Sequence, residues 1–149
     1  MKAKKIFENL NDMLKPKELS STEIDNWNNI NFQKELYNAI ETTGEDYWEC
    51  HPRTEGDINI NEIEHILSLG ITVINDHIEI ACMFFIPDVI ETLLNSNNIE
   101  HINTSECISI ITRNYNNLIN NVDYGEYEWD QITNDKDNSI NLLVNHIQK

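Results

Sequence analysis

The chain has 149 residues, with 26 acidic side chains against 10 lysines and arginines, and its formal net charge is −16. This length fits a single domain, 1–149, that can bury its own hydrophobic core. The acidity argues against direct binding of DNA or RNA, whose phosphates need lysine and arginine partners. Three cysteines without a CxxC pair argue against a disulfide framework, and no apolar run is long enough for a membrane-spanning helix. We therefore expect a soluble, cytoplasmic protein without a membrane partner.

The N-terminal segment, 1–19, predicts a short amphipathic helix or docking arm. Ile6, Leu10 and the Met13–Leu14 pair recur at helical spacing, and Pro16 ends the pattern. Five lysines against three acids give the first 20 residues a charge of +2, which leaves −18 for the rest of the chain. The negative charge is therefore concentrated after this arm.

A helix is expected from about Asn31 to Thr42, because Phe32, Leu36 and Ile40 fall on one face. The segment that follows, 43–57, combines polar residues with glycine and proline, so we expect an insertion loop. Aromatic side chains stand among carboxylates in this loop, a composition suited to recognising a basic surface. The residues concerned are Glu45, Asp46, Tyr47, Trp48 and Glu49. Packing of the tryptophan into the core, which would pin the loop, is an equally good interpretation.

Two helices joined by a tight turn are predicted from Ile78 to Asn97. Apolar residues recur at three- and four-residue spacing on both sides of Pro87, and proline suits the first turn of the second helix. A further helix is expected before them, between Asn61 and Gly70, where a glycine can end a helix in the left-handed conformation.

The stretch IEIACMFFIPDVIETLLNSN, Ile78–Asn97, resembles the helical part of an ankyrin repeat. Asn61–Asn75 is similar to the second helix and exit of an earlier repeat, with Gly70 in the family's glycine position. Phe85 stands where the family has a glycine between its helices. The residues that match the two apolar helix patterns are Ile80, Ala81, Cys82, Val89, Ile90, Leu93 and Leu94. The resemblance implies an all-α fold, a short stack of helical hairpins that binds other proteins, and an irregular helical bundle is the alternative.

The hairpin region, 31–122, is expected to end in a third helical pair. Thr104 can cap a helix that carries Cys107, and a partner helix would run from Tyr115 to Val122. Cys82 and Cys107 lie on apolar stripes, so we expect both thiols to be reduced and in the core.

The C-terminal region, 123–149, is predicted to hold an acidic aromatic loop and a capping helix that begins near Asp137 or Asn138 and closes the stack. If the loop lies on the same edge as 45–49, the two segments form one acidic aromatic patch. The acids and aromatics of the loop are Asp123, Tyr124, Glu126, Tyr127, Glu128, Trp129 and Asp130.

No recognised catalytic, phosphate-binding or metal motif occurs, and Cys50 beside His51 is the nearest approach to a metal site. We predict no enzyme activity, no cofactor and no metal. The preferred function is a non-enzymatic acidic inhibitor whose two aromatic segments cover a basic surface of a partner protein. An immunity protein against a toxin and a phage anti-defence inhibitor of a nuclease both fit this description. The alternative is an ankyrin-like interaction scaffold whose acidity serves solubility.

Overall fold

The computed structural model describes residues 21–49 and 59–147, with side chains from Ile30 onward in the first range. Regular secondary structure in these ranges is helical apart from one isolated bridge, so the predicted all-α fold is confirmed. The described helices are α2 (Ser21–Glu49), α3 (Asn61–Ser68), α4 (Asn75–Phe84), α5 (Pro87–Leu94), α6 (Thr104–Asn121) and α7 (Glu126–Ile147). None of these helices is both long enough and apolar enough to cross a membrane.

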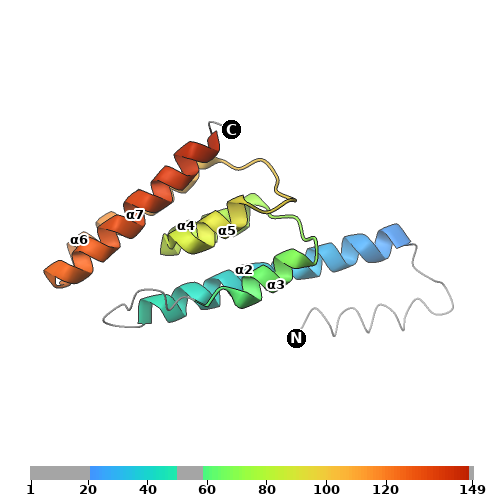
Figure 1. Ribbon diagram of the computed structural model, residues 1–149, viewed down its shortest axis with the longest axis horizontal. Helices are drawn as coiled ribbons and strands as arrows, with labels where there is room; N and C mark the ends of the chain where they lie inside the picture. Colours follow the sequence, from blue (N-terminus) through green and yellow to red (C-terminus); the bar gives the residue numbers. More distant parts are fainter. Residues whose placement is uncertain (1–20, 50–58, 148–149) are drawn as a thin grey trace.

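The helices form three layers, and each layer is a pair of helices that are consecutive in the chain (Figure 1). Helix α2 packs on α3, α4 on α5, and α6 on α7. The first helices of the pairs also pack in order, α2 on α4 and α4 on α6, while α5 packs on α7. The short α4–α5 pair therefore lies between two pairs that contain longer helices. This arrangement is a short stack of helical hairpins.

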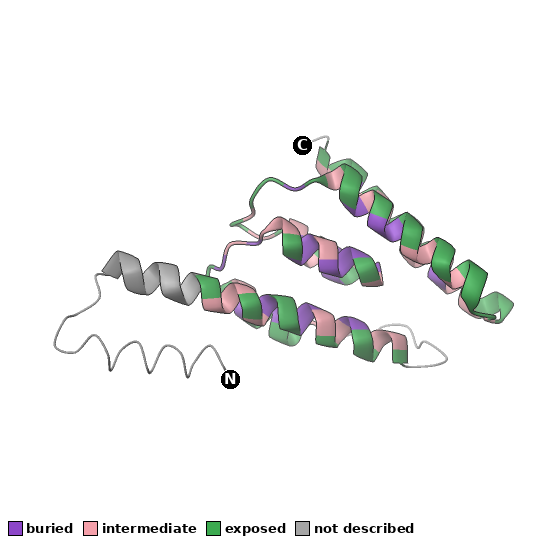
Figure 2. Ribbon diagram, turned by 180° about the vertical axis from the view of Figure 1, so that it is seen from behind, coloured by how far each residue is buried: buried purple, intermediate pink, exposed green. Residues whose placement is uncertain are grey.

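The core lies between the layers, where the helices turn their buried faces toward one another (Figure 2). Leu36 of α2, Ile78 of α4 and Ile111 of α6 are completely buried. Burial of such side chains stabilises the stack by about 1.5–3 kcal/mol each. Cys82 and Cys107 are buried as well, as predicted. The neighbouring Cys107 thiol, as a hydrogen-bond partner, and burial both raise the pKa of Cys82.

The turn between α4 and α5 contains one residue with an unusual backbone conformation. Pro87 is the first residue of α5, where its missing N–H leaves no helical hydrogen bond unmade. Phe85 has a φ of 35°, in the left-handed region that favours glycine, and it stands where the ankyrin pattern has glycine. Its ring is almost completely buried. Burial of the ring therefore offsets a backbone strain of about 1–2 kcal/mol.

The connection edge is the side of the stack where residues 69–74 and 95–103 join successive hairpins. These two segments run side by side and form an isolated parallel bridge between Val73 and Ile99. The backbone N–H of Val73 donates to the carbonyl of Asn98 at 2.8 Å. The backbone N–H of Glu100 donates back to the carbonyl of Val73 at 2.9 Å, so the two connections fix each other.

Asparagine side chains add to the connection edge. The amide of Asn98 donates to the Gly70 carbonyl at 3.3 Å and to the Thr72 hydroxyl at 2.9 Å. The side-chain oxygen of Asn75, at the start of α4, accepts from the backbone N–H of Asn103 at 2.9 Å. These bonds set the spacing between consecutive hairpins.

His77 joins α4 to α2 near the same edge. Its Nδ1 accepts the backbone N–H of Ile74 at 3.1 Å, and its Nε2 lies 2.7 Å from the carbonyl of Gln33. A carbonyl can only accept, so the Nε2 atom carries the proton and the ring is neutral with both nitrogens paired. Burial accordingly lowers the pKa of His77. This histidine is a structural residue.

The predicted insertion loop over 43–57 is wrong for 43–49, because α2 continues to Glu49. Gly44 was expected to end the helix, but it has a packing role instead. A Cβ atom at this position would overlap the ring of Phe84 on α4, so the glycine lets α2 approach α4 closely. The rest of that loop, like the predicted N-terminal arm at 1–19 and the Cys50–His51 pair, lies outside the described residues.

The predicted third hairpin is one continuous helix, α6, whose N-cap is Asn103 and not Thr104. The Asn103 side chain accepts the backbone N–H of Glu106 at 3.1 Å. Cys107 and Tyr115 lie on one helical stripe of residues packed on the core, so nothing interrupts the helix between them.

The predicted acidic aromatic loop is also shorter than expected, because α7 begins at Glu126 and not near residue 137. Glu126 and Glu128 lie in the first turn of α7, where carboxylates interact favourably with the helix dipole. Trp129 and Ile132 already belong to the stripe that faces the core. Only the residues from Val122 to Gly125 connect α6 to α7.

Candidate functional site

The two acidic aromatic segments predicted from the sequence lie on one side of the stack, opposite the connection edge (Figure 1). We call this side the turn edge and define it by residues 45–49, 85–87 and 121–130. The C-terminal end of α2, the α4–α5 turn and the α6–α7 connection meet there. The fold therefore brings together segments that are far apart in the chain.

A continuous row of aromatic rings crosses all three hairpins at the turn edge. Each ring meets the next edge to face, with centroids between 5.3 and 6.4 Å apart. Such pairs contribute about 0.5–1.5 kcal/mol each beyond their buried area. The rings in order are Tyr47, Trp48, Phe85, Tyr115, Trp129 and Tyr124.

Hydrogen bonds hold the polar ends of these rings. The hydroxyl of Tyr47 donates to Asp135 of α7 at 2.9 Å, which ties the first hairpin directly to the third. The indole N–H of Trp48 donates to the Phe84 carbonyl at 3.0 Å. Both rings are half-buried and packed on the core. Trp48 therefore packs against the core, the second of the two interpretations given for it above.

Carboxylates stand beside the aromatic residues in both acidic aromatic segments of the turn edge. Among the predicted acids, only Glu128 is half-buried, because its carboxylate folds back over Gly125. Tyr127 is the one aromatic of the predicted set that is mostly exposed, at 59%. The exposed predicted acids are Glu45, Asp46, Glu49, Asp123, Glu126 and Asp130. The turn edge thus combines a row of packed rings, in which Phe85 is buried, with exposed acids in the same two segments.

Few positive charges balance these acids. Among the described side chains, lysines and arginines are limited to Lys34, Arg113 and Lys136. Lys136 lies 2.8 Å from an oxygen of Asp137 and 4.7 Å from the centroid of the Tyr115 ring. The described part of the chain consequently presents a strongly negative field to its surroundings.

Three residues that connect the two segments of the turn edge were not predicted from the sequence. Phe85, Tyr115 and Asp135 lie outside both acidic aromatic segments, yet they connect them. One signal in the sequence pointed to Phe85, because it stands where the ankyrin pattern has a glycine. No local signal distinguishes Tyr115 or Asp135 from other residues on their helices. Only the packing of the three hairpins brings them next to the row of rings.

A second surface lies on the face formed by the first helices of the hairpins, α2, α4 and α6. It holds a groove of about 420 Å³ in which Met83 is 51% exposed. Asp76 and Glu79 contribute negative charge, and Arg113 contributes a positive one. The residues lining this groove are Tyr37, Asp76, Glu79, Ile80, Met83, Ile110, Arg113 and Asn114.

The described residues contain no group of three or more histidine, cysteine, aspartate or glutamate side chains placed to hold a metal ion. Fold and surface together define an acidic all-α protein built as a short stack of helical hairpins. Comparison with protein families, curated proteins and solved structures finds no match to this chain. The resemblance to ankyrin repeats therefore stays a prediction from the residues quoted above.

Proposed function

We propose that this chain is a non-enzymatic inhibitor that covers a basic surface of a partner protein with its turn edge. The observation that carries the proposal is the convergence of both acidic aromatic segments on that edge, where the row of rings from Tyr47 to Tyr124 connects them. Exposed carboxylates steer and pair with a basic partner, and a rigid row of rings limits the entropy lost on binding.

The partner we favour is an enzyme whose active cleft is already basic, such as a nuclease or a nucleic-acid-degrading toxin. Carboxylates arranged along one edge would occupy the place of nucleic-acid phosphates in that cleft. An immunity protein and a phage anti-defence inhibitor both match this chemistry. Residues 45–49 and 123–130 would form the contact.

The test combines partner capture with charge reversal. Proteins from a host lysate are captured on the wild-type chain at low salt, and the affinity of a basic partner is then measured over a salt series. In the test variant, four acids of the turn edge are changed to lysine: Asp123, Glu126, Glu128 and Asp130. In the control, four exposed acids elsewhere are changed to lysine: Glu62, Glu64, Glu91 and Glu100.

The proposal predicts that the turn-edge variant loses binding, that the control retains most of it, and that wild-type affinity falls as salt rises. Equal loss in both variants, or a partner indifferent to salt, would contradict it. If the partner is an enzyme, the wild-type chain and the control variant should inhibit it, and the turn-edge variant should not.

The alternative function is an interaction scaffold that binds a partner through the groove between α2, α4 and α6. The exposed Met83 in that groove favours it, because exposed methionine adapts to varied apolar partners. Met83→Lys would then abolish capture of the partner while the four-lysine turn-edge variant would leave it intact.

A further inference from the structure

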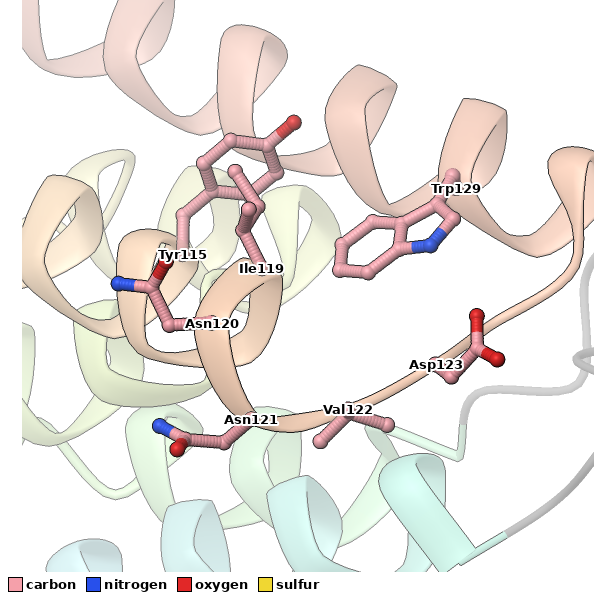
Figure 3. A pocket seen from close by; sticks show the side chains of 7 residues that line it. All are labelled: Tyr115, Ile119, Asn120, Asn121, Val122, Asp123 and Trp129. Carbon is pink, nitrogen blue, oxygen red and sulfur yellow. The ribbon is translucent and has the colours of Figure 1, made fainter.

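A pocket of about 550 Å³ opens at the turn edge, between the end of α6 and the start of α7. Figure 3 shows Trp129 and Asp123 on one side of this pocket, with Tyr115 and Ile119 across from them. The connection through Val122 forms its lower boundary in that view. The residues that line it are Tyr115, Ile119, Asn120, Asn121, Val122, Asp123 and Trp129.

The chemistry of this lining suits one kind of ligand group. Tyr115 and Trp129 contribute aromatic rings to the lining, and the only charged side chain in the lining is the exposed carboxylate of Asp123. Ile119 and Val122 are 49% and 38% exposed, so they present apolar surface at the pocket. The C-terminal end of α6 adds the negative end of a helix dipole. Aromatic, apolar and negative groups together select a cation with an apolar stem.

We propose that this pocket takes the arginine side chain of a partner protein, with the guanidinium over the Trp129 ring and hydrogen-bonded to Asp123. This proposal rests on the proposed function, because it names the group by which the basic partner is anchored. The planar guanidinium can stack on an aromatic ring and bind a carboxylate through two N–H groups, whereas an ammonium group cannot do both. The apolar stem of the arginine would contact Ile119 and Val122.

An internal contact shows that one of the two rings, Tyr115, accepts a cation. Lys136 Nζ already lies 4.7 Å from the centroid of Tyr115, and Lys136 does not line the pocket. Lys136 is therefore not among the lining groups that an incoming side chain would contact. Asp123 is exposed in the α6–α7 connection and requires no rearrangement of the core to meet that side chain.

The experiment titrates N-acetyl-arginine amide into the isotope-labelled full chain and follows the indole N–H signal of Trp129 by two-dimensional NMR. Trp129→Phe identifies this signal among those of the three tryptophans. N-acetyl-citrulline amide, which has the same shape without the charge, is the control ligand. Asp123→Asn is the test variant, and Glu100→Gln, an exposed acid on the connection edge, is the control for loss of one charge.

The expected result is a saturable shift with the arginine compound, little shift with the citrulline compound, and affinity about tenfold lower in Asp123→Asn. Glu100→Gln should match the wild type. Equal shifts with both compounds, or an unchanged affinity in Asp123→Asn, would overturn the proposal. The remaining signals in each spectrum report that the variants are folded.

Failure of this inference differs from failure of the proposed function. If arginine leaves the Trp129 signal unmoved while the four-lysine turn-edge variant still abolishes partner binding, the inhibitor function stands and the pocket does not anchor the partner. If arginine binds as expected but the four-lysine variant retains partner binding, the pocket is real and the inhibitor function is wrong.

Discussion

At the turn edge the three hairpins meet through aromatic rings, whereas at the connection edge they meet through backbone and side-chain hydrogen bonds. The turn edge carries all the predicted binding acids, and the connection edge carries asparagines. Contacts between packed rings depend less on the surrounding charge than hydrogen bonds do, because polar groups need exact partners. We infer that the turn edge keeps its shape under charge changes, which leaves its carboxylates free to serve a partner. Substitutions at four positions, Phe85, Gly44, His77 and Asn98, test this comparison.

The largest effect is expected at the centre of the aromatic row. Phe85→Ala should lower the free energy of unfolding by about 3–5 kcal/mol, because it removes a buried ring that contacts Trp48 and Tyr115. Phe85→Gly should be more stable than Phe85→Ala by about 1 kcal/mol, since glycine adopts a positive φ without strain. Denaturant unfolding measures both values, and an alanine variant more stable than the glycine variant would contradict the strain.

The second effect concerns the close approach of α2 to α4. Helix propensity alone predicts that Gly44→Ala gains about 1 kcal/mol. We expect instead a net loss of about 1–3 kcal/mol, because the added methyl overlaps the Phe84 ring. In a Phe84→Ala background the overlap is gone, so Gly44→Ala should become neutral or stabilising. Thermal or denaturant unfolding of the four combinations measures this coupling.

At the connection edge, His77→Ala should cost about 1–3 kcal/mol, because it leaves the Ile74 N–H and the Gln33 carbonyl without their partner. Denaturant unfolding measures the cost. His77→Gln supplies a donor and an acceptor in a side chain of another shape. It should recover part of the loss, and a glutamine variant no better than alanine would argue against the hydrogen bonds.

His77 also gives this edge a pH dependence. Burial lowers its pKa below the ordinary histidine value of 6.5, so the unfolded chain binds the proton more readily than the folded one. Its stabilisation is therefore complete above that value and is lost as the pH falls through the lowered pKa. Unfolding measured between about pH 7.5 and about pH 5 should show a steeper loss for the wild type than for His77→Ala. If the stability of the two proteins falls in parallel with pH, His77 is not the source of the pH dependence.

The smallest effect is expected from an exposed asparagine. Asn98→Ala removes the bonds to Gly70 and Thr72 and should cost about 0.5–1.5 kcal/mol, since water can replace the lost partners. The neighbouring Asn97→Ala is the matched control and should be nearly neutral. Equal costs for the two variants in denaturant unfolding would show that these bonds do not hold the connection edge.

Local patterns predicted the middle of the chain well. Asn61 begins α3 as expected, and Pro87 begins α5, because apolar period and proline chemistry act within a few residues. The bounds of the longer helices were wrong. Gly44 was read as a breaker although it is a packing glycine, and the acids after Gly125 were read as a loop although they begin α7.

The sequence by itself determined the helical class, the acidity and the position of the short central hairpin, since each follows from composition or from neighbours along the chain. Only the tertiary structure decided that Tyr47 meets Asp135, a residue 88 positions away, and that the rings between them form one row. That contact depends on how three hairpins stack and on how long each helix is. Periodicity within one helix defines its buried face, and packing against the other helices defines which residues that face meets.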